Sequence, residues 1–127
     1  MRALLNHVAN IAIKPLLKSP LHILASGRIM LITFTGRKSG KIYTTPVEYR
    51  RMGDTLLLFT QKGREWWHNL DGAPVTVRVH GQELRGQADI STNSESVYLG
   101  LKSMYPRASE EWVEHTAPDL VMIKVQV

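Results

Sequence analysis

The chain of 127 residues contains no cysteine, and this absence excludes several kinds of site at once. Without thiols there is no disulfide framework, no thiolate nucleophile and no thiolate metal site. A chain of this length buries enough apolar surface to fold as one domain, residues 1–127, without covalent cross-links. The lack of cysteine fits a reducing compartment, and we expect a cytoplasmic protein.

Long uncharged apolar runs are absent as well. No segment approaches the roughly 18 residues of a membrane-spanning helix, and we expect no secretory signal, because a small-residue cleavage site after a long apolar core is lacking. Residues 1–27 are apolar at roughly helical spacing, but Pro15 and Pro20 interrupt them, which predicts an N-terminal helical segment in short pieces. This segment either packs on the edge of the core or makes peripheral contact with a membrane, which would make the protein membrane-associated.

Catalytic and metal-binding motifs are equally scarce. The five histidines do not share a helix at metal-ligand spacing, so we expect no metal site. Ser39 has no nearby histidine and lies in no nucleophile elbow, and the chain has neither a P-loop nor a dinucleotide-binding glycine pattern. An enzyme with this sequence would rely on a cofactor for its chemistry.

Alternating apolar, β-branched and aromatic residues between turn signals predict six strands, at 29–35, 41–51, 55–60, 74–80, 83–90 and 120–127. Gly81-Gln82 is the predicted turn of the second hairpin. Residues 64–70 predict one or two helical turns, residues 92–104 a helix capped by Thr92 or Asn93, and residues 110–115 a shorter helix. Six strands in hairpins with few helices indicate an α+β protein built on a small antiparallel barrel.

Charge of one sign is concentrated in one part of the chain. The net charge is +5, and residues 36–64 hold seven Lys and Arg residues against Glu48 and Asp54 alone. Such a field favours a phosphate, a carboxylate-rich ligand, nucleic acid or an anionic lipid surface. Because Trp66 and Trp67 stand together instead of alternating with the cations, we expect no nucleic-acid partner.

The bend of residues 36–40, Gly-Arg-Lys-Ser-Gly, joins the first two predicted strands. Its glycines permit positive φ, its successive N–H groups can form a concave anion site, and Arg37 and Lys38 add charged donors. In a meander of three strands, this bend lies at the same end of the sheet as Lys62 and Arg64. An isolated basic turn is usually only solvated, so an anion site requires these two clusters to meet.

Two adjacent tryptophans, Trp66 and Trp67, follow the second basic cluster. They cannot both face the same side of a short helix. One is expected to anchor in the core and the other to wall a pocket, where the Asn69 amide can meet the polar edge of a ring. Core packing of the tryptophans is the alternative, and His68 is expected to be structural or exposed.

Taken together, these segments resemble one family. The motifs L-I-T-F-T-G-R-K-S-G, Pro46, Q-K-G, W-x-x-N-L and a late M-Y-P are similar to those of the deazaflavin-dependent nitroreductases, which use reduced coenzyme F420. The resemblance runs from about Ile29 to the C-terminus. It implies a six-stranded antiparallel split β-barrel related to FMN-binding proteins, with an N-terminal helix and short flanking helices. It also implies hydride transfer from reduced F420 to a small-molecule acceptor, namely a quinone, a nitroaromatic or another activated compound.

The resemblance further implies a set of site residues. Phosphate and tail contacts would come from the bend, and ring contacts from the second strand, the end of the third strand and the tryptophan segment. The cofactor-binding residues so implied are Arg37, Lys38, Ser39, Gly40, Tyr43, Thr44, Thr45, Pro46, Val47, Thr60, Gln61, Lys62, Gly63, Trp66, Asn69 and Leu70. Tyr105 is the residue implied to orient or protonate the acceptor, with burial in the core as its alternative.

The chain departs from the family's pattern in several places. Tyr43 stands where better-known members carry an arginine, and Ala108 and Glu111 stand where further pocket tyrosines are expected. The segment between Gly63 and Trp66 is shorter than usual, which keeps FMN as the alternative cofactor and an FMN-binding oxidoreductase or flavin carrier as the alternative function. Split barrels often form dimers, so both a monomer and a homodimer stay open.

Overall fold

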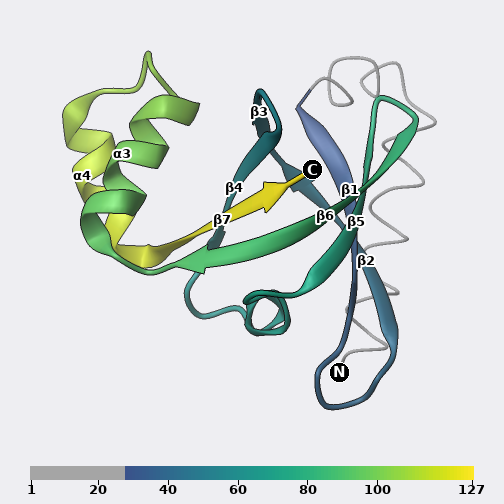
Figure 1. Ribbon diagram of the computed structural model, residues 1–127. Helices are drawn as coiled ribbons and strands as arrows, with labels where there is room; N and C mark the ends of the chain where they lie inside the picture. Colours follow the sequence, from purple (N-terminus) through teal and green to yellow (C-terminus); the bar gives the residue numbers. More distant parts are fainter. Residues whose placement is uncertain (1–27) are drawn as a thin grey trace.

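The structure of the protein is a computed structural model in which residues 28–127 are described. The predicted N-terminal helical segment, residues 1–27, lies outside the described residues. The described chain forms one curled antiparallel sheet, and a pair of helices stands to one side of it (Figure 1). The predictions of an α+β fold and of an antiparallel sheet are therefore confirmed.

Seven strands make up the sheet. Their bounds are β1 Ile29–Thr35, β2 Ile42–Glu48, β3 Arg50–Met52, β4 Thr55–Gln61, β5 Pro74–Val79, β6 Gln82–Ser91 and β7 Leu120–Gln126. They lie in the order β2-β1-β5-β6-β7-β4-β3. The predicted count of six strands was wrong, because the predicted strand 41–51 is divided into β2 and β3.

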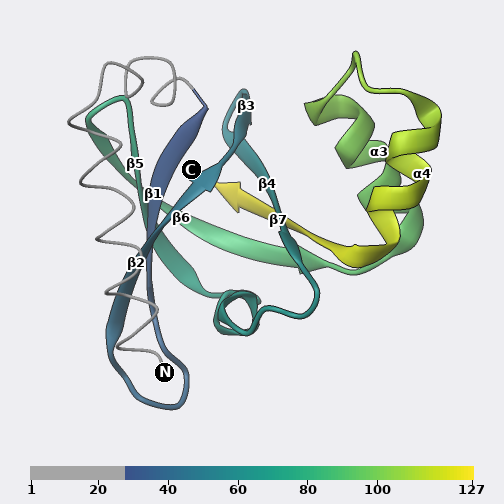
Figure 2. The ribbon, with the colours of Figure 1, turned by 180° about the vertical axis from the view of Figure 1, so that it is seen from behind.

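The division falls at Tyr49 and accounts for the curl of the sheet. Tyr49 is buried, and its backbone N–H donates to the carbonyl of Arg28 at 2.8 Å. On one side of this residue β2 pairs with β1, and on the other side β3 pairs with β4. The two edges of the sheet are thus consecutive segments of one chain, so the sheet must bend round on itself (Figures 1 and 2).

Two helices and two short 3₁₀ turns complete the described chain: α3 Ser94–Met104, α4 Glu110–Thr116, η1 Trp66–Asn69 and η2 Ala117–Asp119. Asn93 caps α3 by accepting a hydrogen bond from Ser96 N–H, and Ser109 caps α4 in the same way through Trp112 N–H. Both helices lie where the sequence predicts them. Neither is long and apolar enough to cross a membrane, in the part of the chain that the structure describes.

The apolar core has two parts, because β4 and β7 are covered on both faces. The curled sheet encloses Leu56, Leu58 and Ile123, together with alternate residues of β1 and β5. A second cluster lies under the helices and consists of Leu57, Val97, Leu101, Met104, Val113, Ala117 and Met122. Successive residues of a strand face opposite sides, so neighbouring positions of β4 enter different clusters.

The second hairpin turns one residue earlier than predicted. Its turn is His80-Gly81, with φ of 51° and 77°, rather than Gly81-Gln82. Two consecutive positive φ values are typical of the tight turn whose twist matches that of the flanking strands. The hairpin itself, β5 with β6, is confirmed.

Candidate functional site

A groove of about 370 Å³ opens between β2 and β4. Its lining consists of Thr45, Pro46, Val47, Glu48, Phe59, Thr60, Gln61, Arg64, Trp66 and Leu120. Within residues 28–127, β2 pairs only with β1, and β3 covers only Thr55–Leu57 of β4. Among the described strands, none pairs with the facing edges of β2 and of the second half of β4, so a ligand in the groove can meet the backbone polar groups of Thr45–Val47 and Thr60–Gln61.

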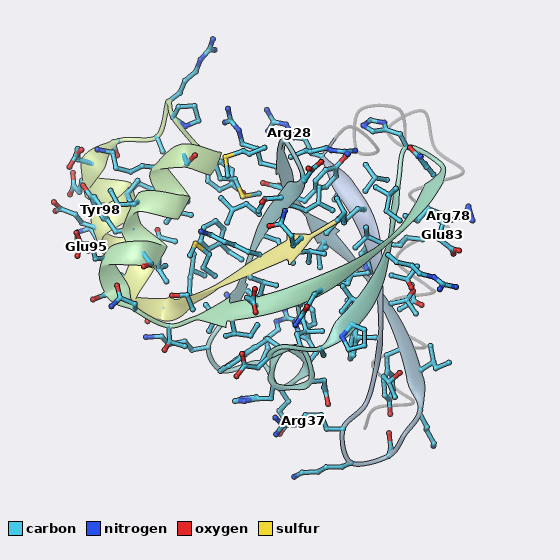
Figure 3. All side chains as sticks on the ribbon, viewed as in Figure 1. Arg28, Arg37, Arg78, Glu83, Glu95 and Tyr98 are labelled. Atoms are coloured by element: carbon cyan, nitrogen blue, oxygen red, sulfur yellow. The ribbon has the colours of Figure 1, made fainter. Side chains whose placement is uncertain are left out.

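The bend of residues 36–40 is fixed to η1 through Asn69. The N–H of Arg37 donates to Asn69 Oδ1 at 2.8 Å, and Asn69 Nδ2 donates to the carbonyl of Trp66 at 3.0 Å. At the end of β4, the indole N–H of Trp67 donates to the carbonyl of Lys62 at 3.3 Å. Both basic loops are thus attached to η1, and Figure 3 shows Arg37 beside it. The prediction that the two loops lie at one end of the sheet is confirmed.

Most N–H groups of this bend are used inside the protein. Gly36 donates to the carbonyl of Lys41, Gly40 donates to the carbonyl of Gly36, and Lys41 donates to Ser39 Oγ. With the N–H of Arg37 held by Asn69, three of the five N–H groups of residues 36–40 are used within the protein, so a concave anion site would have to use the successive N–H groups of Lys38 and Ser39. Arg37 and Lys38 are exposed, so their side chains are the positively charged groups that the bend presents to solvent.

Trp66 is both part of the core and a wall of the groove. It is 7% exposed, its indole N–H donates to Thr60 Oγ1 at 3.1 Å, and its ring lies 5.8 Å from that of Phe34. Phe34 in turn stacks on Tyr43 at 5.8 Å. Trp67 is only half-buried. Trp66 and Trp67 therefore face different surroundings, as predicted. The prediction gave the roles of core anchor and pocket wall to different tryptophans, whereas Trp66 alone fills both.

The structure divides the cofactor-binding residues implied by the sequence into three groups. Six of them line the groove: Thr45, Pro46, Val47, Thr60, Gln61 and Trp66. Six others are exposed in the two basic loops: Arg37, Lys38, Ser39, Gly40, Lys62 and Gly63. The remaining four are occupied within the protein: Tyr43, Asn69 and Leu70 are buried, and Thr44 Oγ1 is hydrogen-bonded to Thr33 Oγ1 at 2.9 Å.

Three groove residues were not expected from the sequence: Glu48, Phe59 and Leu120. Arg64, which the charge pattern placed in the second basic cluster, also lines the groove. Glu48 lies two residues after Pro46, on the same face of β2, and this period of two was available in the sequence. Leu120 offered no such signal, because β7 reaches the groove only through its pairing with β4, where Leu120 stands opposite Gln61.

Tyr105 lies in a second hollow, of about 550 Å³, formed by the residue before β1, by β3, by α4 and by the α3–α4 turn. Its lining is Arg28, Arg50, Tyr105, Pro106, Arg107, Ala108 and Trp112. The Tyr105 hydroxyl donates to Glu48 Oε1. Burial, and then this hydrogen bond, raise the pKa of Tyr105, so the phenol is protonated at neutral pH. Because Glu48 lines the groove, the Tyr105–Glu48 pair stands where the two hollows adjoin.

Residues 28–127 contain no candidate metal site. No three His, Asp or Glu side chains of this part of the chain lie close enough together to hold a metal ion. The polar groups of the groove are the hydroxyls of Thr45 and Thr60, the amide of Gln61, the guanidinium of Arg64, the carboxylate of Glu48 and the strand backbone, which suit an organic ligand.

Solved structures first define the class of fold. An F420 reductase is 19% identical, with a TM-score of 0.54 over 83% of this chain and 90% of that chain. An F420-H2 dependent reductase, FDR-A, is 22% identical, with a TM-score of 0.56 over 78% and 94%. An FAD and heme binding protein from Mycobacterium smegmatis is 16% identical, with a TM-score of 0.56 over 86% and 66%. At these identities the likeness shows a shared fold.

The sequence itself then gives the family. The family model of F420H2-dependent quinone reductase matches residues 20–117. The chain therefore belongs to the F420H2-dependent quinone reductase family. A comparison with curated proteins found no match.

Proposed function

We propose that this protein is a single-domain split barrel that transfers a hydride from reduced coenzyme F420 to a quinone or another activated organic acceptor. Membership of the F420H2-dependent quinone reductase family supports this reaction. The observation that carries it for this chain is the groove between β2 and β4, with strand edges, an aromatic wall and cations around one opening. A flat ring that carries an anionic tail is the ligand that such a groove suits.

The groove residues fit the cofactor group by group. The backbone of Thr45–Val47 and the side chains of Thr60 and Gln61 offer hydrogen-bonding partners to the polar edge of a ring. Trp66 offers an apolar wall against the ring face. Reduced F420 supplies the hydride when it is bound, and the chain's own residues hold and orient it.

The phosphate and the acidic tail of the cofactor fit the two basic loops. Arg37 and Lys38 are exposed on one loop, and Lys62 and Arg64 on the other. Asn69 holds the first loop against η1, so we assign it a positioning role rather than a direct contact with the ring. A guanidinium binds phosphate oxygens in a planar, two-pronged geometry, whereas an ammonium acts as a point charge.

Tyr105 is the residue that we assign to the acceptor. Reduction of a quinone to a hydroquinone consumes, in net terms, one hydride and one proton. Because the pKa of Tyr105 is raised, its phenol is a hydrogen-bond donor that orients the acceptor carbonyl, and solvent supplies the proton. An acceptor would take the hydrogen bond that Glu48 accepts in the structure.

A side-by-side titration with F420 and FMN tests the proposal. The wild-type protein is expected to bind F420 more tightly than FMN, with an affinity that falls as salt is added. Replacing Arg37 and Lys38 together with alanine is expected to raise the Kd for F420 about 10- to 100-fold, because two charge-assisted contacts are lost. The melting temperature should hardly change, since exposed turn charges contribute little to folding.

The matched control is Arg78→Ala with Arg85→Ala, which removes the same charge from exposed positions of β5 and β6. Figure 3 shows Arg78 on a different side of the molecule from Arg37. The control should leave the Kd within about twofold, since long-range charge effects are screened. Tighter binding of FMN than of F420 would favour the flavin alternative. A collapse of the melting temperature with unchanged F420 affinity would show that the bend is only structural.

A further inference from the structure

Three arginines gather in the hollow beside Tyr105, and none of them forms a salt bridge within residues 28–127. Arg28, Arg50 and Arg107 all line this hollow and are all exposed. Glu48 lines an adjoining hollow together with Arg28 and Arg50. Between residues 28 and 127 the one salt bridge joins Lys102 to Glu110, and residues 1–27 contain neither Asp nor Glu. Three positive charges outnumber the one negative charge of Glu48, so the hollow is net positive and a bound anion relieves the remaining repulsion.

The same hollow offers an aromatic surface. Trp112 is 43% exposed, which is unusual for the largest apolar side chain, and its ring meets the edge of Tyr105 with centroids 5.5 Å apart. The volume of about 550 Å³ lies within the range of small-molecule sites. Cations and an accessible indole in one hollow suit a molecule that has both an acidic group and a ring.

This basic hollow is distinct from the basic loops that flank the groove. Figure 3 shows Arg28 and Arg37 at opposite ends of the sheet. The hollow nevertheless adjoins the groove, because the Tyr105 hydroxyl donates to Glu48, which is part of the groove lining. A molecule anchored on the arginines can therefore place its ring at the boundary with the groove.

We propose that this hollow is the acceptor site, and that the acceptor is an acidic aromatic compound. Its anionic group lies on Arg28, Arg50 and Arg107, and its ring lies against Trp112 beside the Tyr105 hydroxyl. The proposal rests on the proposed function and narrows its acceptor to quinones or nitroaromatics that carry a carboxylate, phosphate or sulfonate. Planar guanidinium groups suit each of these anions.

Binding to the cofactor-free protein tests this site without any turnover. The probes are 1,4-naphthoquinone-2-sulfonate and its uncharged parent, 1,4-naphthoquinone, which share one ring system. Calorimetry is expected to show at least about tenfold tighter binding of the sulfonate, a difference that shrinks with added salt. Equal affinity of the wild-type protein for the two probes would overturn the proposal, and it would leave the F420 titration untouched.

The variant Arg50→Gln with Arg107→Gln should abolish this preference while retaining the affinity for the parent quinone. Arg78→Gln with Arg85→Gln, again on exposed positions of β5 and β6, should preserve it. Arg107→Gln alone, in the α3–α4 turn, serves as a second variant. It is expected to reduce a tenfold preference for the sulfonate over the parent quinone to about threefold. A preference that survives in the first double variant would contradict the proposal.

Turnover with saturating reduced F420 then places the site on the reaction path. The ratio of kcat/KM for the sulfonate to that for the parent should fall about tenfold in Arg50→Gln with Arg107→Gln, and the Kd for F420 should be unchanged. A loss of F420 affinity in this variant, with an unchanged ratio, would instead show that the arginines hold the acidic tail of the cofactor.

Discussion

The groove between β2 and β4 and the helical corner, which consists of α3, α4 and the turn between them, hold their side chains by different means. Groove residues lie on strands, and the neighbouring bend is fixed by the hydrogen bonds of Asn69 to Arg37 and Trp66. The corner is attached through a smaller apolar cluster under the helices. Its surface carries the exposed Lys102–Glu110 ion pair, a kind of contact that contributes little to stability.

This difference separates two tasks of one enzyme. The groove is part of the sheet, so its shape depends on the strand pairing that holds the whole molecule together. The corner brings Tyr105, Arg107 and Trp112 to the neighbouring hollow, and its side chains can change without altering the register of any strand. We infer that cofactor binding is tied to the stability of the fold, whereas acceptor choice is tied to the corner.

The largest effect is expected from cavities in the two apolar clusters. Leu58 is buried inside the sheet and Leu101 under the helices. Replacement of either by alanine should lower the free energy of unfolding by about 2–5 kcal/mol. Hydrogen exchange should nevertheless differ: Leu58→Ala speeds exchange throughout the sheet, whereas Leu101→Ala speeds it mainly in α3 and α4. Equal acceleration of both regions in both variants would mean that the corner is no separate unit.

A smaller effect is expected at Asn69. The Asn69 side chain is 7% exposed and makes two hydrogen bonds, one from the N–H of Arg37 and one to the carbonyl of Trp66. Asn69→Ala removes both of them. We expect a loss of about 1–3 kcal/mol in unfolding free energy, measured with a denaturant, and weaker F420 binding through a looser bend. The control Gln87→Ala removes an exposed amide bond to the carbonyl of Gly72 and should cost about 0.5 kcal/mol or less. An unchanged affinity for F420 in Asn69→Ala would show that cofactor binding does not depend on the hydrogen bond between Asn69 and the bend.

The smallest effect on stability is expected at Tyr105. Tyr105→Phe removes one hydrogen bond to Glu48 and should cost about 0.5–1.5 kcal/mol near pH 7. The pKa of Tyr105 is raised above its ordinary value of 10.0, mainly by burial, so the folded protein binds this proton more tightly than the unfolded chain. The contribution is complete below pH 10 and is lost as the pH rises further.

Denaturant midpoints of the wild-type protein and of Tyr105→Phe should therefore converge above pH 10. Turnover of a quinone should fall about tenfold in the variant with an unchanged Kd for F420, because only the acceptor loses its hydrogen-bond donor. A difference in midpoint that does not depend on pH would contradict the linkage, and unchanged turnover would remove Tyr105 from the reaction.

Particular residues show which parts of the candidate site could be predicted from the sequence. The groove residues Thr45–Val47, Thr60, Gln61 and Trp66 were implied by a family motif, because their order along the chain carries the pattern. The contact of Tyr105 with Glu48 joins residues 57 apart, and no local pattern predicts it. The hydrogen bond from Arg37 N–H to Asn69 joins residues 32 apart, and no local pattern predicts it either.

The sequence by itself determined the strands, the helices with their caps and the concentration of positive charge, since these depend on neighbours a few residues apart. Only the tertiary structure decided that the predicted strand 41–51 breaks at Tyr49, because the break serves the closure of the curled sheet. It also decided that three arginines, one just before β1, one in β3 and one in the α3–α4 turn, share one hollow. Such meetings depend on strand register and helix packing, which connect residues that lie far apart in the chain.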